Sequence, residues 1–418
     1  MSPPGRPKGE YRSAQHEGSP VSPEAPQPLA GLRVVEFTHM VMGPTCGMVL
    51  ADLGAEVIKV EPLGGEGTRR LLGAGAGFFP MFNRNKKSVA VDLHQEDGAA
   101  VARRLAVSAD VVIENFKPGT MTKYGLDWPA LSAANLRLIY ASHKGFLPGP
   151  YEHRTALDEV VQMMGGLAYM TGRPGDPLRA GTSINDIMGG MFGAIGVLGA
   201  LIQRGITGRG MEVQSALFEN NVFLMGQHML QYAMTGRHPA PMPARDNPWA
   251  VYDVFTVRDG EQIFLAAVSD AQFATFCDVL GFADLKADPA LATNNDRVKV
   301  RPALLATLRE RLASRRADEL AAIFERAGLP FAPIRRPEDL FDDPHLLATG
   351  GLADVVLPDG DKAGQTVKTT LFPITMQGAR LPVRVQPPRL GEHTDDLLLG
   401  LGYAADDIAG LRERNVIA

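Results

Sequence analysis

The chain has 418 residues, of which 45% are hydrophobic and 21% charged, and its formal net charge is -5. This length is natural for two domains, and the composition is that of a globular protein rather than a disordered one. No basic excess is available to neutralise phosphates, which argues against nucleic acid as a partner. The two cysteines, Cys46 and Cys277, form no CxxC pair. We therefore expect a reducing, cytoplasmic location.

Two segments bear on targeting and membranes. Residues 1–29 are rich in Pro, Gly, Ser and Glu and lack an apolar stretch, so we predict a disordered tail and no signal peptide. Residues 187–202 are the most apolar segment and contain five glycines. A membrane span needs roughly 20 apolar residues. We therefore predict a buried helix at 187–202 and no membrane partner.

Short apolar strands alternate with helices through the first part of the chain. The pattern predicts strands over 32–37, 56–61, 88–93, 110–115 and 137–142, and helices over 45–53, 98–108 and 129–134. Such alternation with short loops implies a mostly parallel sheet with helices on its faces. The predicted fold class is α/β.

The pattern changes after residue 236. Proline-rich residues 239–248 are typical of a linker. Two predicted strands follow, at 249–257 and 262–268, and then several helices over 270–327. The chain returns to strands at 352–357 and 365–371. The helical part has the size of a second, smaller domain. Residues 391–396 open a final helix whose acidic first turn suits the helix dipole.

Common catalytic motifs are absent from the sequence. There is no GxxxxGK[ST] phosphate loop, GxSxG elbow, HExxH motif or clustered Cys/His set, so no metal site is predicted. The glycine-rich residues 73–77 do not lie between the first strand and its helix, which is where a dinucleotide-binding loop belongs.

Asp186 stands directly before the apolar, glycine-spaced helix. Local sequence leaves two interpretations open. Asp is a favoured N-cap that satisfies first-turn N–H groups. Alternatively, the helix is buried, so the carboxylate lies at an interior end, where N–H groups and the dipole keep it ionised for chemistry. Glycines at that helix surface indicate close approach of another backbone or a ligand.

Basic residues recur just after the predicted strands, where ligands of open α/β sheets bind. Each alone fits a solvated surface charge, whereas the group fits an anion pocket. The residues are Lys59, Arg69, Arg70, Arg84, Lys86, Lys87, Lys117, Lys123 and Lys144.

Several short segments occur in order from about residue 30 to 403. They are Phe37-Thr38-His39, Gly43-Pro44, the run from Asp52 to Glu61, Asn83 to Ser88, Glu114 to Gly119, Thr207 to Gly210 and Leu390 to Asp395. Each segment is weakly specific alone, but the ordered set resembles one family, the family III CoA-transferases (the CaiB/BaiF group).

The resemblance implies an architecture that periodicity could not provide. Family members have a Rossmann-like large domain and a smaller α+β domain. Here the large domain would comprise residues 30–238 and 339–418, and the small domain, with its linkers, 239–338. The resemblance also implies an interlocked homodimer, with each active site between the large domain of one subunit and the small domain of the other.

The resemblance also assigns residues. The family's catalytic aspartate matches Asp186, which would act as a covalent nucleophile through aspartyl anhydride and aspartyl-CoA thioester intermediates. An ionised carboxylate needs no general base. The partners would be acyl-CoA and carboxylic acid substrates, with no tightly bound cofactor. Residues matched to CoA binding are His39, Asn115, Phe116, Lys117, Lys123 and Lys144.

Substrate identity is less constrained. Arg154 is a candidate for the free carboxylate of an acid by a charge-assisted contact, and Asp158 is assigned to the same site. Residues 144–159 and 185–190 resemble family members that move CoA between the C1 and C4 carboxyls of mesaconyl-CoA. Val41 and Pro62 depart from formyl-CoA transferases. We expect C4–C5 dicarboxylates.

Two alternatives stay open at this point. A racemase of the same fold needs a histidine opposite its aspartate, at the position of Leu157, and leucine cannot move a proton. A non-catalytic CoA-binding protein is the other alternative, and the intact Asp186 argues against it.

Overall fold

The computed structural model describes residues 25–245 and 247–418. Most of the predicted tail, residues 1–24, lies outside the described residues. Its last residue, Leu29, is buried, and its backbone N–H donates a hydrogen bond to the carbonyl oxygen of Leu53 (3.0 Å). The tail prediction therefore extends too far, because Leu29 belongs to the hydrophobic core.

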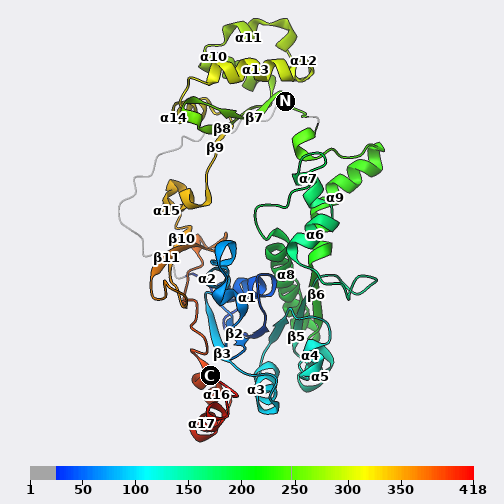
Figure 1. The fold of residues 1–418 in the computed structure, drawn as a ribbon, viewed down its shortest axis with the longest axis vertical. Coiled ribbons are helices and arrows are strands. Elements are labelled where there is room, and N and C mark those ends of the chain that lie inside the picture. Colours follow the sequence, from blue (N-terminus) through cyan, green and yellow to red (C-terminus); the bar gives the residue numbers. More distant parts are fainter. Residues whose placement is uncertain (1–24, 246) are drawn as a thin grey trace, which may run out of the picture.

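A six-stranded sheet lies in the lower half of the molecule in Figure 1, and all its neighbouring strands are parallel. The strand order is β3-β2-β1-β4-β5-β6. This confirms the α/β prediction. The strands are β1 (Arg33–Phe37), β2 (Glu56–Glu61), β3 (Lys86–Ala90), β4 (Val111–Glu114), β5 (Ile139–Lys144) and β6 (Glu212–Ala216).

The sheet order reverses between β1 and β4, because the chain builds β2 and β3 on one side of β1 before it crosses to the other side. In open α/β sheets, ligands bind at such a switch point, beyond the carboxyl ends of the strands. The strand prediction was wrong in detail at β3, which begins at Lys86 rather than Ser88, and it missed β6.

Helices cover both faces of the sheet. On one face lie α1 (Met42–Asp52) and α8 (Ile184–Thr207). Helices from distant parts of the chain cover the other face, where their apolar residues share a core with alternate strand residues such as Val35 and Phe37. These helices are α3 (Glu96–Val107), α5 (Trp128–Ala134), α16 (Thr394–Gly400) and α17 (Ala405–Glu413).

The glycines of α8 allow α1 and β5 to approach closely. A Cβ atom on Gly190 would lie 2.5 Å from the Met42 carbonyl oxygen, and one on Gly193 would lie 2.2 Å from Nε2 of His143. A Cβ atom on Gly199, in contrast, would have no atom of the chain's other parts within 4 Å. By length and composition α8 is the one helix of the described ranges that is apolar enough to cross a membrane. Here its glycine face packs within the protein.

A second unit contains residues 251–333, set apart from the large sheet in Figure 1. Its three strands are antiparallel, and its helices enclose a separate hydrophobic core. The elements are β7 (Val251–Thr256), β8 (Gln262–Ala267), β9 (Phe331–Pro333), α10 (Asp270–Leu280), α11 (Ala283–Ala287), α12 (Asn294–Lys299), α13 (Arg301–Leu312) and α14 (Ala317–Ala327).

Two separate segments connect this unit to the sheet, one after α9 (Leu217–Thr235) and one leading into α15 (Pro344–Ala348) (Figure 1). The remaining elements lie around the sheet or on these connections. They are α2 (Phe78–Phe82), α4 (Thr120–Lys123), α6 (Asp158–Met164), α7 (Leu167–Thr171), β10 (Leu352–Val356), β11 (Thr366–Thr370), β12 (Thr375–Met376) and β13 (Ala379–Arg380).

Candidate active site

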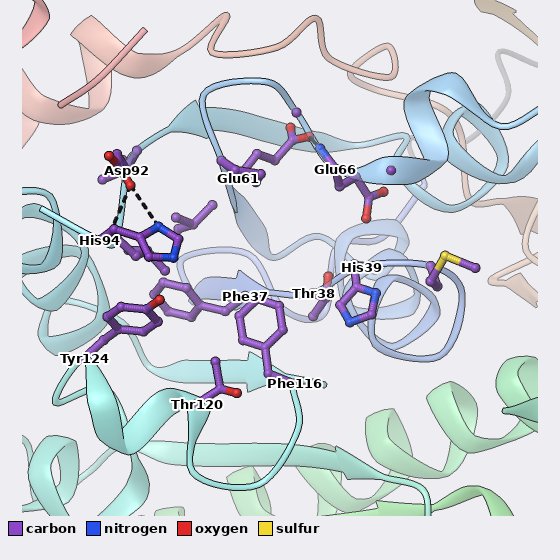
Figure 2. Close-up of a pocket in the computed structure, with 17 residues that line it drawn as sticks. Phe37, Thr38, His39, Glu61, Glu66, Asp92, His94, Phe116, Thr120 and Tyr124 are labelled. Carbon is purple, nitrogen blue, oxygen red and sulfur yellow. Dashed lines mark hydrogen bonds and ion pairs between the residues drawn. The ribbon is translucent and has the colours of Figure 1, made fainter. Parts of the chain in front are cut away.

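A cavity of about 400 Å³ opens at the carboxyl ends of β1, β2 and β3 (Figure 2). Its lining consists of aromatic, apolar, acidic and hydroxyl-bearing residues and includes no lysine or arginine among the described residues. Such a lining suits an uncharged, flat group better than a phosphate. It consists of residues 37–40, 60–62, 65–67, 91–94, Phe116, Thr120 and Tyr124.

His39 and Phe116 form one wall of this cavity, as Figure 2 shows. Their ring centroids are 5.6 Å apart and the ring planes are inclined by only 18°. Desolvation lowers the pKa of His39, although the carboxylate of Glu66 acts in the opposite direction. The imidazole is therefore neutral at pH 7, and the wall is an uncharged aromatic surface.

Asn115 lies beside this wall, but its side chain is already engaged. Its Oδ1 atom accepts a hydrogen bond from the backbone N–H of His39 (3.0 Å). Its Nδ2 group donates to the carbonyl oxygen of the same residue (2.8 Å). The sequence predicted Asn115 as a CoA-binding residue, and in the structure its side chain holds the main chain of His39 beside the first cavity.

A second cavity, of about 340 Å³, adjoins the first at Phe116 and is more basic. Lys117, Lys144 and Arg154 all line it. The guanidinium carbon of Arg154 lies 4.0 Å from the ring centroid of Tyr151. The structure thus brings together three of the predicted cations.

Lys144 is not a free cation within that cavity. Its Nζ atom lies 2.6 Å from Oε1 of the buried Glu114. The other oxygen of Glu114 accepts a hydrogen bond from the backbone N–H of Phe116 (2.9 Å). Lys123, in contrast, is exposed and lines neither cavity. Its Nζ atom lies 5.5 Å from the ring centroid of Tyr124, which does line the first cavity.

Four other cations predicted to form an anion pocket lie inside the protein, and this part of the prediction was wrong. The physical reason is that a buried charge requires a partner, and each of these has a carboxylate close by. The pairs are Lys59 with Glu36 and Glu66 (3.5 and 3.6 Å), Arg69 with Glu61 (2.6 Å), Arg84 with Asp52 (2.7 Å) and Lys86 with Glu36 (2.8 Å).

Asp186 is the third residue of α8, and the N-cap position belongs to Ser183. The interpretation of Asp186 as an N-cap was therefore wrong. The first-turn N–H groups are satisfied by Asp158, at the start of α6. Its Oδ1 atom accepts hydrogen bonds from the backbone N–H of Asn185 (2.7 Å) and of Asp186 (3.2 Å). Asp158 thus fixes the backbone that carries Asp186.

The carboxylate of Asp186 is half-buried, and its charge is poorly stabilised. Burial, and next the negative charge of Asp158, raise the pKa of Asp186 to about 7, while Arg179 acts in the opposite direction. The expectation that helix N–H groups keep this carboxylate fully ionised was wrong, because those groups bind Asp158.

Arg179 is a site residue that sequence reasoning missed. Its Nη2 atom lies 3.6 Å from Oδ2 of Asp158, and its Nη1 atom lies 3.4 Å from Oε2 of Glu159. The only signal in the sequence was its place in the loop before α8. Across residues 25–245 and 247–418, no cluster of three or more His, Cys, Asp or Glu side chains could hold a metal ion.

The parallel sheet, with one cavity at its switch point and a more basic cavity beside it, places the chain among the α/β proteins that bind ligands at the carboxyl ends of their strands. The sequence model of "CoA-transferase family III" matches residues 29–394. The chain belongs to this family, and it is a CoA-transferase. CoA-transferases use CoA thioesters as substrates.

Similar proteins support the assignment over nearly the whole chain. The chain is 34% identical to the succinate–glutarate CoA-transferase of Agrobacterium fabrum, over 91% of this chain and 97% of the relative. It is 34% identical to the succinyl-CoA–D-citramalate CoA-transferase of Chloroflexus aurantiacus, over 95% and 100%. The crystal structure of a CaiB/BaiF family protein from Brucella suis is similar with a TM-score of 0.81 and 36% identity, over 90% and 100%.

Proposed function

We propose that Asp186 is the covalent nucleophile of a CoA-transferase that acts on C4–C5 dicarboxylic acids. The observation that supports the proposal most is the fixed position of this carboxylate together with its raised pKa. The carboxylate lies on a rigid first helical turn that Asp158 holds through the backbone, and its pKa is raised to about 7. A carboxylate with a raised pKa is a stronger nucleophile than an ordinary aspartate and still ionises near neutral pH.

Transfer then proceeds without proton movement. The Asp186 carboxylate attacks the thioester carbonyl carbon, and the C–S bond breaks to give an aspartyl anhydride and the CoA thiolate. The thiolate attacks the aspartyl carbonyl and expels the donor carboxylate, which leaves an aspartyl-CoA thioester. The acceptor carboxylate attacks this thioester and releases the thiolate, which leaves an anhydride between Asp186 and the acceptor. The thiolate then attacks the acceptor acyl carbon, forms the new CoA thioester and expels the free Asp186 carboxylate. Each step keeps the acyl group activated.

The two cavities suit the two ends of the CoA nucleotide. The first cavity, with its neutral wall of His39 and Phe116, fits the adenine ring. The adjoining basic cavity fits the phosphates, and Lys117 is an exposed cation in its lining. Lys144 contributes by holding Glu114 and the Phe116 backbone, and Lys123 by attracting the anion from the outer surface.

The choice of acid rests on Arg154 and on the relatives. Arg154 is exposed at the basic cavity and free to bind the second carboxylate of a dicarboxylic acid. The relatives are named for succinate, glutarate and citramalate. An intramolecular C1–C4 transfer on mesaconyl-CoA belongs to the same class of substrate.

The alternative activities are less well supported. A racemase would place a proton-transferring base at residue 157, and the side chain there is a leucine that is 62% exposed. A protein that only binds CoA would not need a carboxylate with a raised pKa on a fixed helical turn.

We also propose that the enzyme is an interlocked homodimer. Residues 30–238 and 339–418 would form one domain and residues 239–338 the other. The separate hydrophobic cores support this division. Apolar side chains remain exposed along α8 and α9, and burial by a second copy would remove them from water. They include Ile195, Ile202, Ile206, Phe223, Leu230 and Met234. We propose a cytoplasmic location as well, and the two free, buried cysteines are compatible with a reducing compartment.

A matrix of acyl-CoA donors and carboxylic acid acceptors, scored for CoA exchange, tests the substrate proposal. We expect exchange with succinyl-CoA and C4–C5 dicarboxylates, and with mesaconyl-C1-CoA incubated alone if transfer is intramolecular. Arg154→Leu should raise the KM for dicarboxylates at least tenfold, because one charge-assisted contact is worth about 1.5–3 kcal/mol. Exchange restricted to monocarboxylic acids, or an unchanged KM in the variant, would contradict it.

A further inference from the structure

The turn that follows β1 is held in an unfavourable backbone conformation. Met40 has a φ of +64°, in the left-handed region that residues other than glycine rarely adopt. Such conformations persist only when surrounding contacts impose them, and they are concentrated at functional sites. The turn comprises Thr38, His39 and Met40, and all three line the first cavity.

The surrounding contacts come from two sides. From β2, the Nζ atom of Lys59 donates hydrogen bonds to the carbonyl oxygen of Thr38 (2.9 Å) and to its hydroxyl oxygen (3.4 Å). From the end of β4, the amide of Asn115 binds both the N–H and the carbonyl oxygen of His39 (3.0 and 2.8 Å). The turn is therefore fixed at two consecutive residues by two side chains from different strands.

A glycine makes this arrangement possible. A Cβ atom on Gly43 would lie 2.7 Å from Cγ2 of Thr38 and 3.1 Å from Cγ of Asn115. Any larger residue at 43 would push the turn and Asn115 apart. The family motif Gly43-Pro44 thus serves the packing of this turn.

The Lys59 side chain is closed off from a ligand, and the Asn115 side chain keeps only part of its hydrogen-bonding capacity for one. The Lys59 side chain is 0% exposed, and its charge is balanced by Glu36 and Glu66. Burial alone would lower the pKa of Lys59, but those carboxylates, Glu66 foremost, raise it, so the ammonium group stays charged. The Asn115 amide uses its Oδ1 atom and one N–H of its Nδ2 group in hydrogen bonds to the His39 backbone.

We propose that Asn115 and Lys59 are positioning residues that hold the 38–40 turn so that the His39 ring stays stacked on Phe116. Together they shape the wall against which the adenine of CoA packs. We call Asn115 and Lys59 together the clasp. The proposal rests on the proposed function, and it makes Asn115 a residue that positions the turn rather than one that contacts the ligand.

A double-mutant cycle on CoA affinity, measured by calorimetry with the full chain, tests the clasp. Asn115→Ala removes two hydrogen bonds from the turn, and we expect the Kd for CoA to rise about tenfold. In a His39→Ala background the same substitution should change the Kd less than about twofold, because the ring that the clasp positions is gone. Equal fold-losses in both backgrounds would show a direct contact by Asn115 and overturn the proposal.

Two further measurements separate positioning from loss of fold. The kcat/KM penalty of Asn115→Ala should shrink when acyl-pantetheine, which lacks the nucleotide, replaces acyl-CoA. Gly43→Ala leaves Asn115 and Lys59 in place and should still raise the Kd for CoA. A penalty of the same size with both substrates, or normal CoA affinity in Gly43→Ala, would contradict the clasp.

Failure of the clasp and failure of the proposed function give different results. Wild-type protein incubated with acyl-CoA and hydroxylamine should form a hydroxamate at Asp186, whatever Asn115 does. If the hydroxamate forms but the double-mutant cycle is additive, only the clasp is wrong. If no hydroxamate forms with dicarboxylyl-CoA donors, the proposed function is wrong, and with it the premise of the clasp.

Discussion

At the first turn of α8, two carboxylates stand close together and only one of them is hydrogen-bonded to the helix. Asp158 accepts hydrogen bonds from the N–H groups of Asn185 and Asp186. Asp186 is left with a pKa of about 7, raised by burial first and by Asp158 second. Asp158 therefore sets the position of the proposed nucleophile and adds, after burial, to its basicity. Two experiments on charge can test this.

The rate of acylation should depend on the ionised form of Asp186. We expect single-turnover acylation by acyl-CoA to rise about tenfold per pH unit below pH 7 and to level off above it. Asp158→Asn keeps an oxygen that can accept the N–H bonds but removes the negative charge. Its profile should shift to lower pH. A profile that is flat from pH 5 to 8 in the wild type would contradict the raised pKa.

The same pKa predicts a cost in stability. A carboxyl group whose pKa rises on folding, here from 3.8 to about 7, favours the folded state only while it is protonated. The destabilisation is absent below pH 3.8, grows as the pH rises and is complete above about pH 7. Asp186→Asn should therefore raise Tm by a few degrees at pH 8 and hardly at pH 4. Differential scanning calorimetry at both values checks this, and a lower Tm at pH 8 would refute it.

At the scale of elements, the glycine face of α8 determines how closely this helix packs against α1. The Cβ of an alanine at 190 would lie 2.5 Å from the Met42 carbonyl oxygen, which belongs to backbone and cannot turn away. Gly190→Ala should therefore lower Tm and disturb the Asp186 turn.

The matched control for that substitution is Gly199→Ala on the same helix. Nothing within the chain lies within 4 Å of a Cβ at 199, so Gly199→Ala should leave the packing of α8 against α1 intact. In thermal unfolding, the Gly190→Ala variant should therefore have a lower Tm than the Gly199→Ala variant. Equal destabilisation by both substitutions would contradict the packing account.

Strands β1 and β4 could be predicted because they are mostly apolar, whereas the start of β3 was missed because it begins with Lys86 and Lys87. β6 could not be predicted, because it is an edge strand whose Glu212 and Gln214 face solvent. The same contrast holds at the site. Asp186 and Asn115 were assigned to the site through the family resemblance. Arg179 was not assigned, because its importance comes from a contact with Asp158 across the fold. Which lysines are buried also depends on partners that no local pattern reveals.

At the scale of the whole molecule, the exposed apolar surface of α8 and α9 needs an explanation. Ile206 is 77% exposed and Met234 85% exposed. Monomeric proteins rarely leave such a surface uncovered. The chain should therefore sediment as a dimer, at twice its mass of 44.9 kDa. A monomer at micromolar concentration in analytical ultracentrifugation would contradict the proposed assembly.

The two connections between the sheet and the 251–333 unit, visible in Figure 1, give the chain a ring-like path. An interlocked dimer predicts that dissociation requires unfolding. Dilution to nanomolar concentration should leave the dimer intact, and its subunits should not exchange. The subunits of a dimer whose chains are not interlocked would exchange. Subunit exchange between two differently labelled samples measures this directly.

The central claim is that Asp186 becomes acylated during transfer. Wild-type protein incubated with succinyl-CoA and hydroxylamine, then digested and analysed by mass spectrometry, should carry a hydroxamate on the peptide containing Asp186. Asp186→Asn should carry none while still binding CoA. Unmodified Asp186 in a sample that exchanges CoA normally would contradict the account.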